Sequence, residues 1–462
     1  MSLPKKTTVL RDPVHGDVRL TAEEMAVLDT PQMQRLRGIK QLGAAHLAYP
    51  GAVHTRFDHS IGTLHMTGRL IEAIGRNFEL DPKNCLGIAP EEARVIRLAA
   101  LIHDVTHVPY GHNVEDQSGL MERHDAPSRY RAMLSTETAL GRVLREVGVY
   151  EDVLGVLLAE GGDGEAAAVP PYWAQLMSDT ICSDILDYLA RDAYFTGLKL
   201  GVDDRLLEHF RVDRQTGNLF IDLSKRNLLR EDILSEIVRT LEARYYFSER
   251  VYYHHAKVSA GALVARAVEL SLRAGTVTPE DLYTQTDDSL LGLLERRSAG
   301  APDGLGKRIA DLCQRLRERR LYKRVAVYPR YANEDVQPSL VERFFAREAA
   351  DQRREVEERL SDLVRFATGR DIDVMVYCPS AKMQLKAAQT HVRWPGEGAP
   401  LPLANFAERV PRLKDLERSY RDLWKFYVLV DTGEPALLAK LQEIVAGEFP
   451  EATNTYQVPG AR

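Results

Sequence analysis

Apolar residues in the first two-thirds of the chain recur at spacings of three and four, the period of a helix with one buried face. "HSIGTLHMTGRLIEAIGRNF" (59–78) shows this spacing. "EEARVIRLAALIHDV" (91–105) adds acidic residues in its first turn, where they suit the helix dipole. "AEEMAVLDTPQMQRLRGI" (22–39) predicts a helix that begins after Thr21 and is interrupted at Pro31.

Two further stretches carry the same period. "YWAQLMSDTICSDILDYLARDAYF" (172–195) predicts a helix, and residues 230–275 predict two or three helices in sequence. Between these helices and the earlier ones, "EGGDGEAAAVPP" (160–171) has the glycine and proline content of a loop.

The pattern changes near Arg320. Short runs rich in β-branched and aromatic residues then alternate with helical segments, which predicts strands; the runs are "LYKRVAVYPR", "DIDVMVYCPS", "MQLKAAQTHVRW" and "WKFYVLVDTG". We therefore expect a mainly α protein, with a helical domain over residues 1–320 and a smaller α/β region over residues 321–462.

Composition excludes several classes of protein. The 462 residues are 44% hydrophobic and 28% charged with a net charge of −6, which is typical of a globular protein and disfavours non-specific nucleic-acid binding. Four dispersed cysteines without a CxxC pair argue against a zinc ribbon or a disulfide framework. The N-terminal "MSLPKKTTVL" lacks the apolar segment of a signal peptide, and no apolar run reaches the roughly 18 residues of a membrane helix. We expect a soluble cytoplasmic protein without a membrane partner.

Candidate chemistry begins at His103-Asp104, where the apolar stretch 95–102 ends. A buried carboxylate is costly unless it is paired or bound to a metal. For an isolated pair the simpler interpretation is that His103 caps the helix and Asp104 starts a loop. His59, on the preceding predicted helix, is by itself also more often a structural histidine than a metal ligand.

A second acidic group lies in "SDILDYLARD", where Asp184, Asp187, Tyr188 and Arg191 share one helix face. Taken alone, this face is expected to meet water. Together with the two histidines and Asp104, however, Asp184 completes a mixed nitrogen and oxygen ligand set. Such a set suits a divalent ion that keeps positions for water or phosphate oxygens.

Five blocks between residues 11 and 197 extend this pattern: "RDPVHGDVRL", "DTPQMQRLRGIKQLG", "YPGAVHTRFDHSIG", "LIHDVTHVPYGH" and "SDILDYLARDAYFTG". In this order they resemble the HD-domain deoxynucleoside triphosphate triphosphohydrolase family, which includes the animal SAM-and-HD-domain dNTP hydrolases and bacterial dGTP hydrolases. The resemblance implies an HD-domain helical core and metal-dependent hydrolysis of dNTPs to deoxynucleoside and inorganic triphosphate. Beyond residue 200 it is carried by little more than "RLYK" (320–323).

The resemblance also implies roles for individual residues. The metal ligands would be His59, His103, Asp104 and Asp184. His124 would protonate the leaving 5′-oxygen or activate water, with Glu115 orienting such a histidine and His112 beside it. Residues that contact the substrate would be Gln41 and Leu42 at sugar and base, Arg56 and His107 at the phosphates, Tyr188 where a 2′-hydroxyl is excluded, Asp192 at the 3′-hydroxyl, and Lys257. The physics agrees, because phosphoester cleavage needs a cation to absorb charge and a proton donor for the leaving alkoxide.

The sequence departs from the family pattern in two places. Ile185 stands where the animal enzyme has a phosphate-binding lysine, and the histidines and tyrosines of "RVYYHHAKV" (250–258) are placed differently. Family members are commonly oligomers activated by a nucleotide, so the resemblance implies a homo-oligomer, a dimer or a tetramer. Asp29, Gln34 and Arg37 match residues that read an activating guanine; for each residue taken alone, a helix cap at Asp29 and solvent exposure of Arg37 are the favoured interpretation.

Several alternatives stay open at this stage. The scaffold would also suit an HD-type hydrolase of nucleoside monophosphates, ribonucleotides or alarmones, although Tyr188 followed by Asp192 favours deoxynucleotides. A nucleotide-binding regulator with little turnover is disfavoured by the complete ligand set. Weak single-stranded nucleic-acid binding is compatible with the basic residues of the α/β region, which lack interleaved aromatics. Base preference is open, and the ligands suit manganese, magnesium, iron or zinc.

Overall fold

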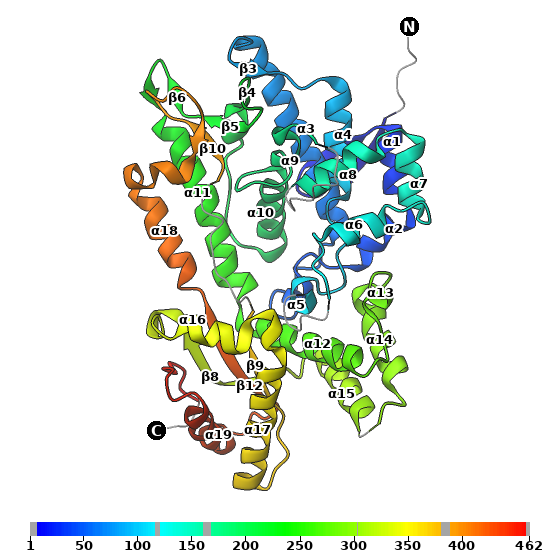
Figure 1. The fold of residues 1–462 in the computed structure, drawn as a ribbon, viewed down its shortest axis with the longest axis vertical. Helices are drawn as coiled ribbons and strands as arrows, with labels where there is room; N and C mark the ends of the chain where they lie inside the picture. The colour runs from blue at the N-terminus through cyan, green and yellow to red at the C-terminus, as the bar shows by residue number, and fades with distance from the viewer. Residues whose placement is uncertain (1–6, 116–120, 160–167, 303, 380–388, 459–462) are drawn as a thin grey trace.

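The computed structural model describes residues 7–115, 121–159, 168–302, 304–379 and 389–458, and it is mainly helical as predicted (Figure 1). The centre of the helical body is α3 (Arg56–Leu80), which packs on α4 (Pro90–Ile102) and α10 (Ser183–Thr196). Other helices surround these three: α1 (Ala22–Leu28), α2 (Pro31–Arg35), α6 (Pro127–Met133), α7 (Ala139–Glu146), α8 (Tyr150–Leu158) and α9 (Pro171–Gln175).

Local signals in the sequence explain where these helices begin and end. Thr55 caps α3 and forms a capping box with Asp58, and Thr21 caps α1 in the same way. Pro90 occupies the first turn of α4, where the missing N–H costs nothing. Helix α10 ends at Gly197, whose φ of 73° lies in the left-handed region.

Residues 172–195, predicted as one helix, form two helices separated by a non-helical segment. Helix α9 stops at Gln175, and α10 begins at Ser183. Ser183 turns the intervening chain back on itself, because its N–H and its hydroxyl both donate to the carbonyl of Leu176. Short polar side chains here offer the backbone partners outside a helix, which the apolar spacing does not reveal.

Strands also occur in the first half of the chain, where none was expected. β1 (Thr8–Asp12) and β2 (Gly16–Leu20) form a hairpin. A mixed five-stranded sheet has the order β11-β10-β5-β4-β3, from β3 (Cys85–Leu86), β4 (Phe210–Asp213), β5 (Leu219–Asp222), β10 (His391–Arg393) and β11 (Leu401–Pro402). These strands are too short for a clear alternating pattern.

The five-stranded sheet joins distant parts of the sequence. β10 pairs in parallel with β5, opposing Val392 to Ile221. Trp394, Leu403 and Phe406 then pack in the same apolar cluster as Phe210. Residues beyond 390 therefore return to the helical body, and the division at residue 320 stays a prediction about folding units.

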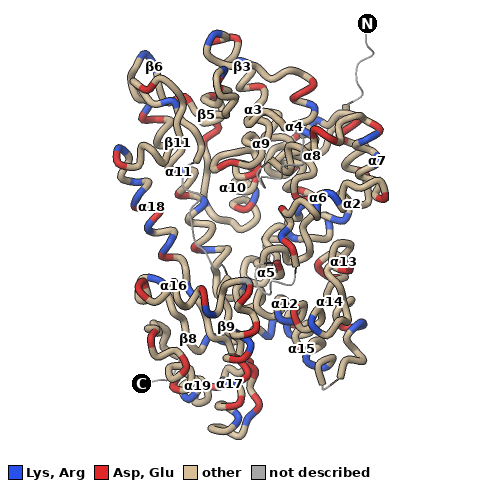
Figure 2. Tube along the Cα trace, in the orientation of Figure 1, with Lys and Arg blue, Asp and Glu red and all other residues tan. Residues whose placement is uncertain are grey.

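The α/β region is built on a second, antiparallel sheet with the order β8-β12-β9, from β8 (Lys323–Pro329), β12 (Lys425–Val430) and β9 (Val374–Tyr377). Helices α17 (Ala350–Thr368) and α19 (Pro435–Glu448) cover it, around buried Trp424, Phe426 and Tyr328. Figure 2 shows acidic and basic residues interleaved along α17. These strands confirm three of the four runs predicted after residue 320. The fourth run, residues 383–394, lies outside the described residues up to 388 and contains β10 of the five-stranded sheet.

The two regions are connected by a pair of long helices. α11 (Glu231–Phe247) descends from the five-stranded sheet and passes through one turn of π-helix (Ser248–Tyr252) into α12 (His255–Arg273) (Figure 1). Helix α12 packs against α15 (Leu305–Arg317) and against the single turn α5 (His112–Glu115). The remaining elements are α13 (Pro279–Leu282), α14 (Asp287–Ser298), α16 (Gln337–Leu340), α18 (Pro411–Arg421), β6 (Ser224–Lys225) and β7 (Leu228–Leu229).

The four cysteines are buried free thiols. Among the helices of the described residues, none combines the length and hydropathy needed to cross a bilayer.

Candidate active site

Three helices bring together the four residues predicted as metal ligands. His59 lies in the first turn of α3, His103 and Asp104 follow the last turn of α4, and Asp184 lies in the first turn of α10. An oxygen of Asp184 is 2.8 Å from His59 Nε2 and 3.7 Å from His103 Nε2. Nitrogen and oxygen atoms of His59, His103 and Asp104 lie within 4.8 Å of one another. The geometry is therefore that of a mixed ligand cluster.

The two imidazoles leave their inner nitrogens without hydrogen bonds. His103 Nδ1 lies 2.8 Å from the carbonyl oxygen of Ala100, which turns Nε2 toward the cluster. Nε2 of His59 and Nε2 of His103 are both buried and have no hydrogen bond, although an oxygen of Asp184 lies 2.8 Å from His59 Nε2. Orphaned buried polar atoms are costly in a folded protein. Two such nitrogens beside two carboxylates fit a divalent cation.

A buried carboxylate orients His59 from behind. Asp187, which is fully buried, lies 2.7 Å from His59 Nδ1 and pairs with Arg191 through two hydrogen bonds of 2.9 and 3.0 Å. His15 Nε2 contacts the same carboxylate at 2.6 Å, and Arg191 also donates to Asp12 at 2.8 Å. A carboxylate on the outer nitrogen of a ligating histidine is the usual arrangement around bound metals.

This network requires the glycine at position 62 on α3. A Cβ at Gly62 would lie 1.9 Å from Asp187 Oδ1 and 2.3 Å from a terminal nitrogen of Arg191. Any larger residue would separate α3 from α10 at the level of His59.

The charges of the cluster do not balance without a cation or protons. The carboxylates of Asp12, Asp104, Asp184 and Asp187 face the guanidiniums of Arg56 and Arg191, so four negative charges meet two positive ones. A divalent cation would supply the missing two charges.

The pKa shifts show how protons fill this deficit. Burial opposes protonation of His59, but Asp184 and Asp187 outweigh it and raise the pKa of His59 to about 10. Burial likewise opposes protonation of His103, but Asp104 and Asp184 raise its pKa. Burial favours neutral Asp104, but Arg56 and His103 hold the pKa of Asp104 well below its ordinary value. The metal-free cluster is thus held together by protonated imidazoles.

A second group of imidazoles lies beside the cluster. The rings of His107 and His124 stack with centroids 3.7 Å apart, and the ring of His112 stands edge-on to His124 at 5.0 Å. His107 Nε2 is 3.2 Å from Asp104, so the two groups touch. Burial, with Arg56 and His124 close by, holds the pKa of His107 well below its ordinary value. His107 is therefore neutral at physiological pH.

Glu115 holds His124 from the other side. Its carboxylate lies 2.9 Å from His124 Nδ1 and accepts from the guanidinium of Arg129 at 2.8 Å. Thr106 also fixes this loop, because its hydroxyl donates to the carbonyl of His124 at 2.7 Å. Burial favours protonated Glu115, but His124 and Arg129 outweigh it and lower the pKa of Glu115. An ionised carboxylate thus fixes the ring of His124 through Nδ1.

Arg56 and Lys257 bring positive charge close to the ligand cluster and to each other. Arg56 is buried and donates to Asp104 at 2.6 Å. The Lys257 ammonium lies 5.0 Å from the centre of the Tyr252 ring. Burial, reinforced by Arg56 and opposed by Asp192, lowers the pKa of Lys257 to about 8. Lys257 is therefore close enough to both Arg56 and Asp192 to feel their charges.

The residues expected near sugar and base form an adjoining group. Both oxygens of Asp192 are engaged, one by His54 Nε2 and one by the hydroxyl of Tyr252, each at 2.8 Å. Leu42 and Tyr188 pack in one apolar cluster with Phe247 and Tyr252. Gln41 is connected to this group by its backbone N–H, which donates to the carbonyl of His54 at 3.0 Å. The side-chain oxygen of Gln41 is buried and has no hydrogen-bond partner.

A cavity of about 780 Å³ opens over the ligand cluster. Its lining includes His103, Asp104, Asp184, His112 and His124. This volume lies in the usual range of small-molecule sites. Predicted ligands and predicted catalytic residues thus share one cavity.

Asp29, Gln34 and Arg37 lie outside this cavity. Asp29 is exposed at the end of α1. Arg37 donates to the side chain of Gln34 at 2.9 Å, and its guanidinium lies 3.6 Å from the centre of the Phe57 ring. Their part in nucleotide binding stays a prediction.

Sequence reasoning missed the residues that hold the site from behind. Asp187 and Arg191 share the helix face of Asp184, but this face is buried instead of meeting water. Their spacing from Asp184 was visible, whereas Asp12 and His15 contribute through contacts more than 170 residues apart in sequence. Arg244 was also missed: its pKa is raised chiefly by Tyr188, and one terminal nitrogen is buried without a hydrogen bond.

The sequence of the chain is similar to known protein families and to several proteins. Residues 56–192 match the HD domain, and residues 203–435 match the HD associated region. An uncharacterized protein of Methanocaldococcus jannaschii is 27% identical over 69% of this chain and 60% of its own length. The uncharacterized protein YwfO of Bacillus subtilis is 28% identical over 70% of this chain and 72% of its own length.

The deoxynucleoside triphosphate triphosphohydrolase SAMHD1 of Homo sapiens is 28% identical over 48% of this chain and 40% of its own length. The chain thus spans three-fifths or less of two of these three relatives. A crystal structure of a hypothetical protein from Aquifex aeolicus shares the fold, with a TM-score of 0.65 and 22% identity over 95% of this chain and all of the other.

Replacing Gly62 by alanine should destabilise the protein by about 1–3 kcal/mol, because the new methyl group overlaps Asp187 and Arg191. It should also weaken metal binding by moving His59. Gly75→Ala is a matched control on the same helix, since a Cβ there meets no atom within 4 Å. Thermal unfolding and metal titration of both variants test this, and equal behaviour of the two would contradict the packing argument.

Metal binding should strengthen as pH rises, because the cation must displace protons from imidazoles whose pKa values are raised in the metal-free site. The pKa of His59 is about 10, so this imidazole carries a proton at lower pH. For each proton that the metal displaces, the apparent association constant should rise about tenfold per pH unit in that range. Calorimetry in two buffers of different ionisation enthalpy counts the protons released. Proton uptake, or none released at pH 7, would overturn this account.

Proposed function

The chain belongs to the family in which an HD domain is followed by an HD associated region, and on this premise we propose that it is a metal-dependent phosphohydrolase acting on deoxynucleoside triphosphates. The observation that carries the proposal is the pair of orphaned nitrogens, His59 Nε2 and His103 Nε2, facing Asp104 and Asp184 beside a cavity that also holds His124. The products would be a deoxynucleoside and inorganic triphosphate.

His59, His103, Asp104 and Asp184 would hold the metal. When bound, a divalent cation withdraws charge from phosphate oxygens and makes water more acidic. Asp187 keeps His59 in the tautomer that presents Nε2, because its carboxylate accepts from Nδ1–H. Arg191 and Gly62 fix Asp187 in turn.

His124 is proposed as the proton donor. Water adds to the α-phosphorus while the bond from phosphorus to the 5′-oxygen breaks, and that oxygen leaves with the proton of His124. The proton released by the water passes to solvent, from which His124 is protonated again. Glu115, itself paired with Arg129, holds the His124 ring through Nδ1 and so orients the proton donor. His107 and His112 lie beside His124 and can form hydrogen bonds to the phosphates. His107 is neutral, and His112 is exposed.

Arg56 and Lys257 are proposed to face the triphosphate, where converging positive charge stabilises the negative charge that develops on the phosphate oxygens. Tyr188 would exclude a 2′-hydroxyl, and Asp192, held by His54 and Tyr252, would accept from the 3′-hydroxyl. A carboxylate oxygen has two lone pairs, so Asp192 can accept this bond as well. Gln41 and Leu42 lie on the side of the base.

Assembly and activation extend this proposal. A homo-oligomer, with Asp29, Gln34 and Arg37 reading an activating nucleotide at a subunit junction, is the arrangement that the resemblance favours. Arg37 donates to Gln34, and its guanidinium lies over the Phe57 ring, so both side chains are already held next to each other for a nucleotide base. Mass measurement with and without each nucleotide would decide it.

Incubation of the purified protein with each dNTP and each NTP, with manganese or magnesium, tests the reaction. We expect a deoxynucleoside and inorganic triphosphate from dNTPs, and at least about tenfold less product from NTPs if Tyr188 excludes the 2′-hydroxyl. Chromatography resolves the products. Stepwise release of orthophosphate, or preference for ribonucleotides or monophosphates, would assign the site to another HD-type hydrolase.

His103→Ala and Asp104→Ala should each lose the bound metal and turnover together while the fold persists, because each removes a ligand. The expected loss of kcat is at least about a hundredfold, because loss of a residue that only supports a ligand already costs about 10- to 100-fold. His209→Ala replaces a half-buried imidazole outside the site and serves as the control. Metal analysis, circular dichroism and product assays are compared, and full activity in either ligand variant would refute the metal assignment.

A further inference from the structure

The sheet of the α/β region reaches the catalytic loop directly. Tyr377, the last residue of β9, is buried, and its hydroxyl accepts a hydrogen bond of 3.0 Å from Asn113 Nδ2. Asn113 lies on α5 between His112 and Glu115. A residue from the far end of the chain thus touches the one turn of helix that carries two of the proposed active-site groups.

Helix α12 leaves space for this contact. A Cβ at Gly261 would lie 2.4 Å from Asn113 Nδ2 and 3.1 Å from the Tyr377 hydroxyl. The absence of a side chain at Gly261 therefore allows α5, α12 and β9 to meet at one point. Substitution here would displace the amide of Asn113.

Helix α5 depends on such contacts because it is short. It has four residues, and the chain enters it through Tyr110 and Gly111 with φ of 59° and 32°, in the left-handed region. A single turn has no stability of its own in water. Its position, and with it that of His112 and Glu115, must come from tertiary contacts.

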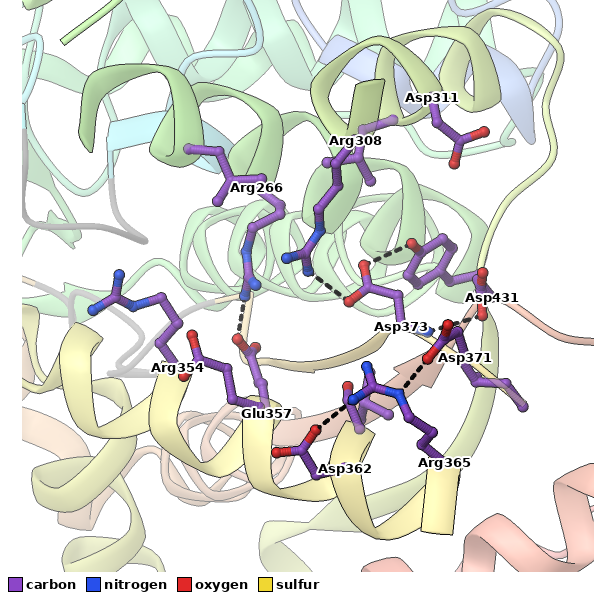
Figure 3. Close-up of a pocket in the computed structure, with 17 residues that line it drawn as sticks. Arg266, Arg308, Asp311, Arg354, Glu357, Asp362, Arg365, Asp371, Asp373 and Asp431 are labelled. Atoms are coloured by element: carbon purple, nitrogen blue, oxygen red, sulfur yellow. Dashed lines mark hydrogen bonds and ion pairs between the residues drawn. The ribbon is translucent and has the colours of Figure 1, made fainter. Parts of the chain in front are cut away.

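Strand β9 is itself held firmly at the junction of the two regions. Glu357 on α17 accepts from the backbone N–H of Val376 at 2.8 Å, and its other oxygen accepts from Arg266 on α12. Just before the strand, Asp373 accepts from Arg308 at 2.6 Å and from Tyr322 at 2.8 Å. Figure 3 shows Arg266 meeting Glu357 and Arg308 meeting Asp373 across a cavity of about 680 Å³.

Burial makes the first of these pairs restrictive. Arg266 and Glu357 are both almost fully buried, so separating them would leave uncompensated charges in the interior. Because Val376 is bonded to Glu357 and precedes Tyr377, the pair fixes the height of the Tyr377 hydroxyl relative to α12. The contact to Asn113 therefore has a rigid base.

We propose that Tyr377 is a positioning residue of the active site: the α/β region sets α5, and hence Glu115 and His124, through the hydrogen bond from Asn113. This inference rests on the proposed function of Glu115 and His124. It gives the C-terminal region a part in turnover without direct contact with substrate.

Tyr377→Phe tests the proposal because it removes the hydroxyl and keeps the ring. On whichever nucleotide the wild-type protein hydrolyses, kcat should fall about three- to tenfold, as expected for one lost hydrogen bond, with KM and metal content unchanged. Tyr427→Phe is the matched control, because Tyr427 lies directly opposite Tyr377 in register on β12. It should keep the wild-type kcat.

A readout without turnover separates this inference from the proposed function. In protein labelled with ¹⁵N-histidine, Tyr377→Phe should shift the imidazole resonances of His112 and His124 and leave that of His209 in place. Asn113→Ala should give the same shifts, and combining it with Tyr377→Phe should add little. If wild type hydrolyses no nucleotide, the shifts still test the positioning.

Unchanged shifts of His112 and His124 in Tyr377→Phe would overturn the inference even in an active enzyme. So would a loss of kcat matched by an equal loss of metal, since that would be a general effect on the site. Additive effects of the two substitutions would contradict a shared hydrogen bond.

Discussion

The site depends on one constraint: carboxylates buried where α3 crosses α10 must meet positive charge. Asp187 has no contact with solvent, so its charge is supportable only through Arg191, His15 and His59. This requirement fixes the ring of His59 and demands a glycine at position 62. It also leaves Asp104 and Asp184 with a deficit that two protons or one divalent cation can fill. Packing and ligand geometry are therefore consequences of the same electrostatic balance.

The same structural device appears at both ends of the active site. Gly62 lets two helices approach until a carboxylate reaches the outer nitrogen of His59, and Gly261 lets a helix and a strand approach until Tyr377 reaches Asn113. His103 has two roles. Its Nδ1 contacts the Ala100 carbonyl at the end of α4, and its Nε2 faces the ligand cluster. Capping and ligation were weighed as alternatives from the sequence, yet one side chain has the geometry for both.

Sequence spacing predicted what is local. Helices with a clear apolar period, the start of a helix after Thr21, and the strands after residue 320 follow from the order of neighbouring residues. The ligand cluster followed from a family resemblance, and the structure brings its four residues together. What could not be predicted lies in contacts between distant segments, such as β10 with β5 and Arg191 with Asp12. A single sequence does not show which buried face will find a partner, so the face of Asp187 was expected to meet water.

These distant contacts argue against treating the α/β region as an appendage. β10 supplies the neighbour that β5 needs, and an unpaired edge there would expose backbone donors and acceptors. β9 supplies the hydroxyl that meets α5, and α12 carries Lys257 toward Asp192 while its other end pairs with α17. The match to the HD associated region runs from residue 203 to residue 435, so it includes β5, β9, β10, α12 and α17 but not α5. The geometry of the helical site is therefore completed by residues that lie after it in the chain, which is why the HD motif alone does not define the active site.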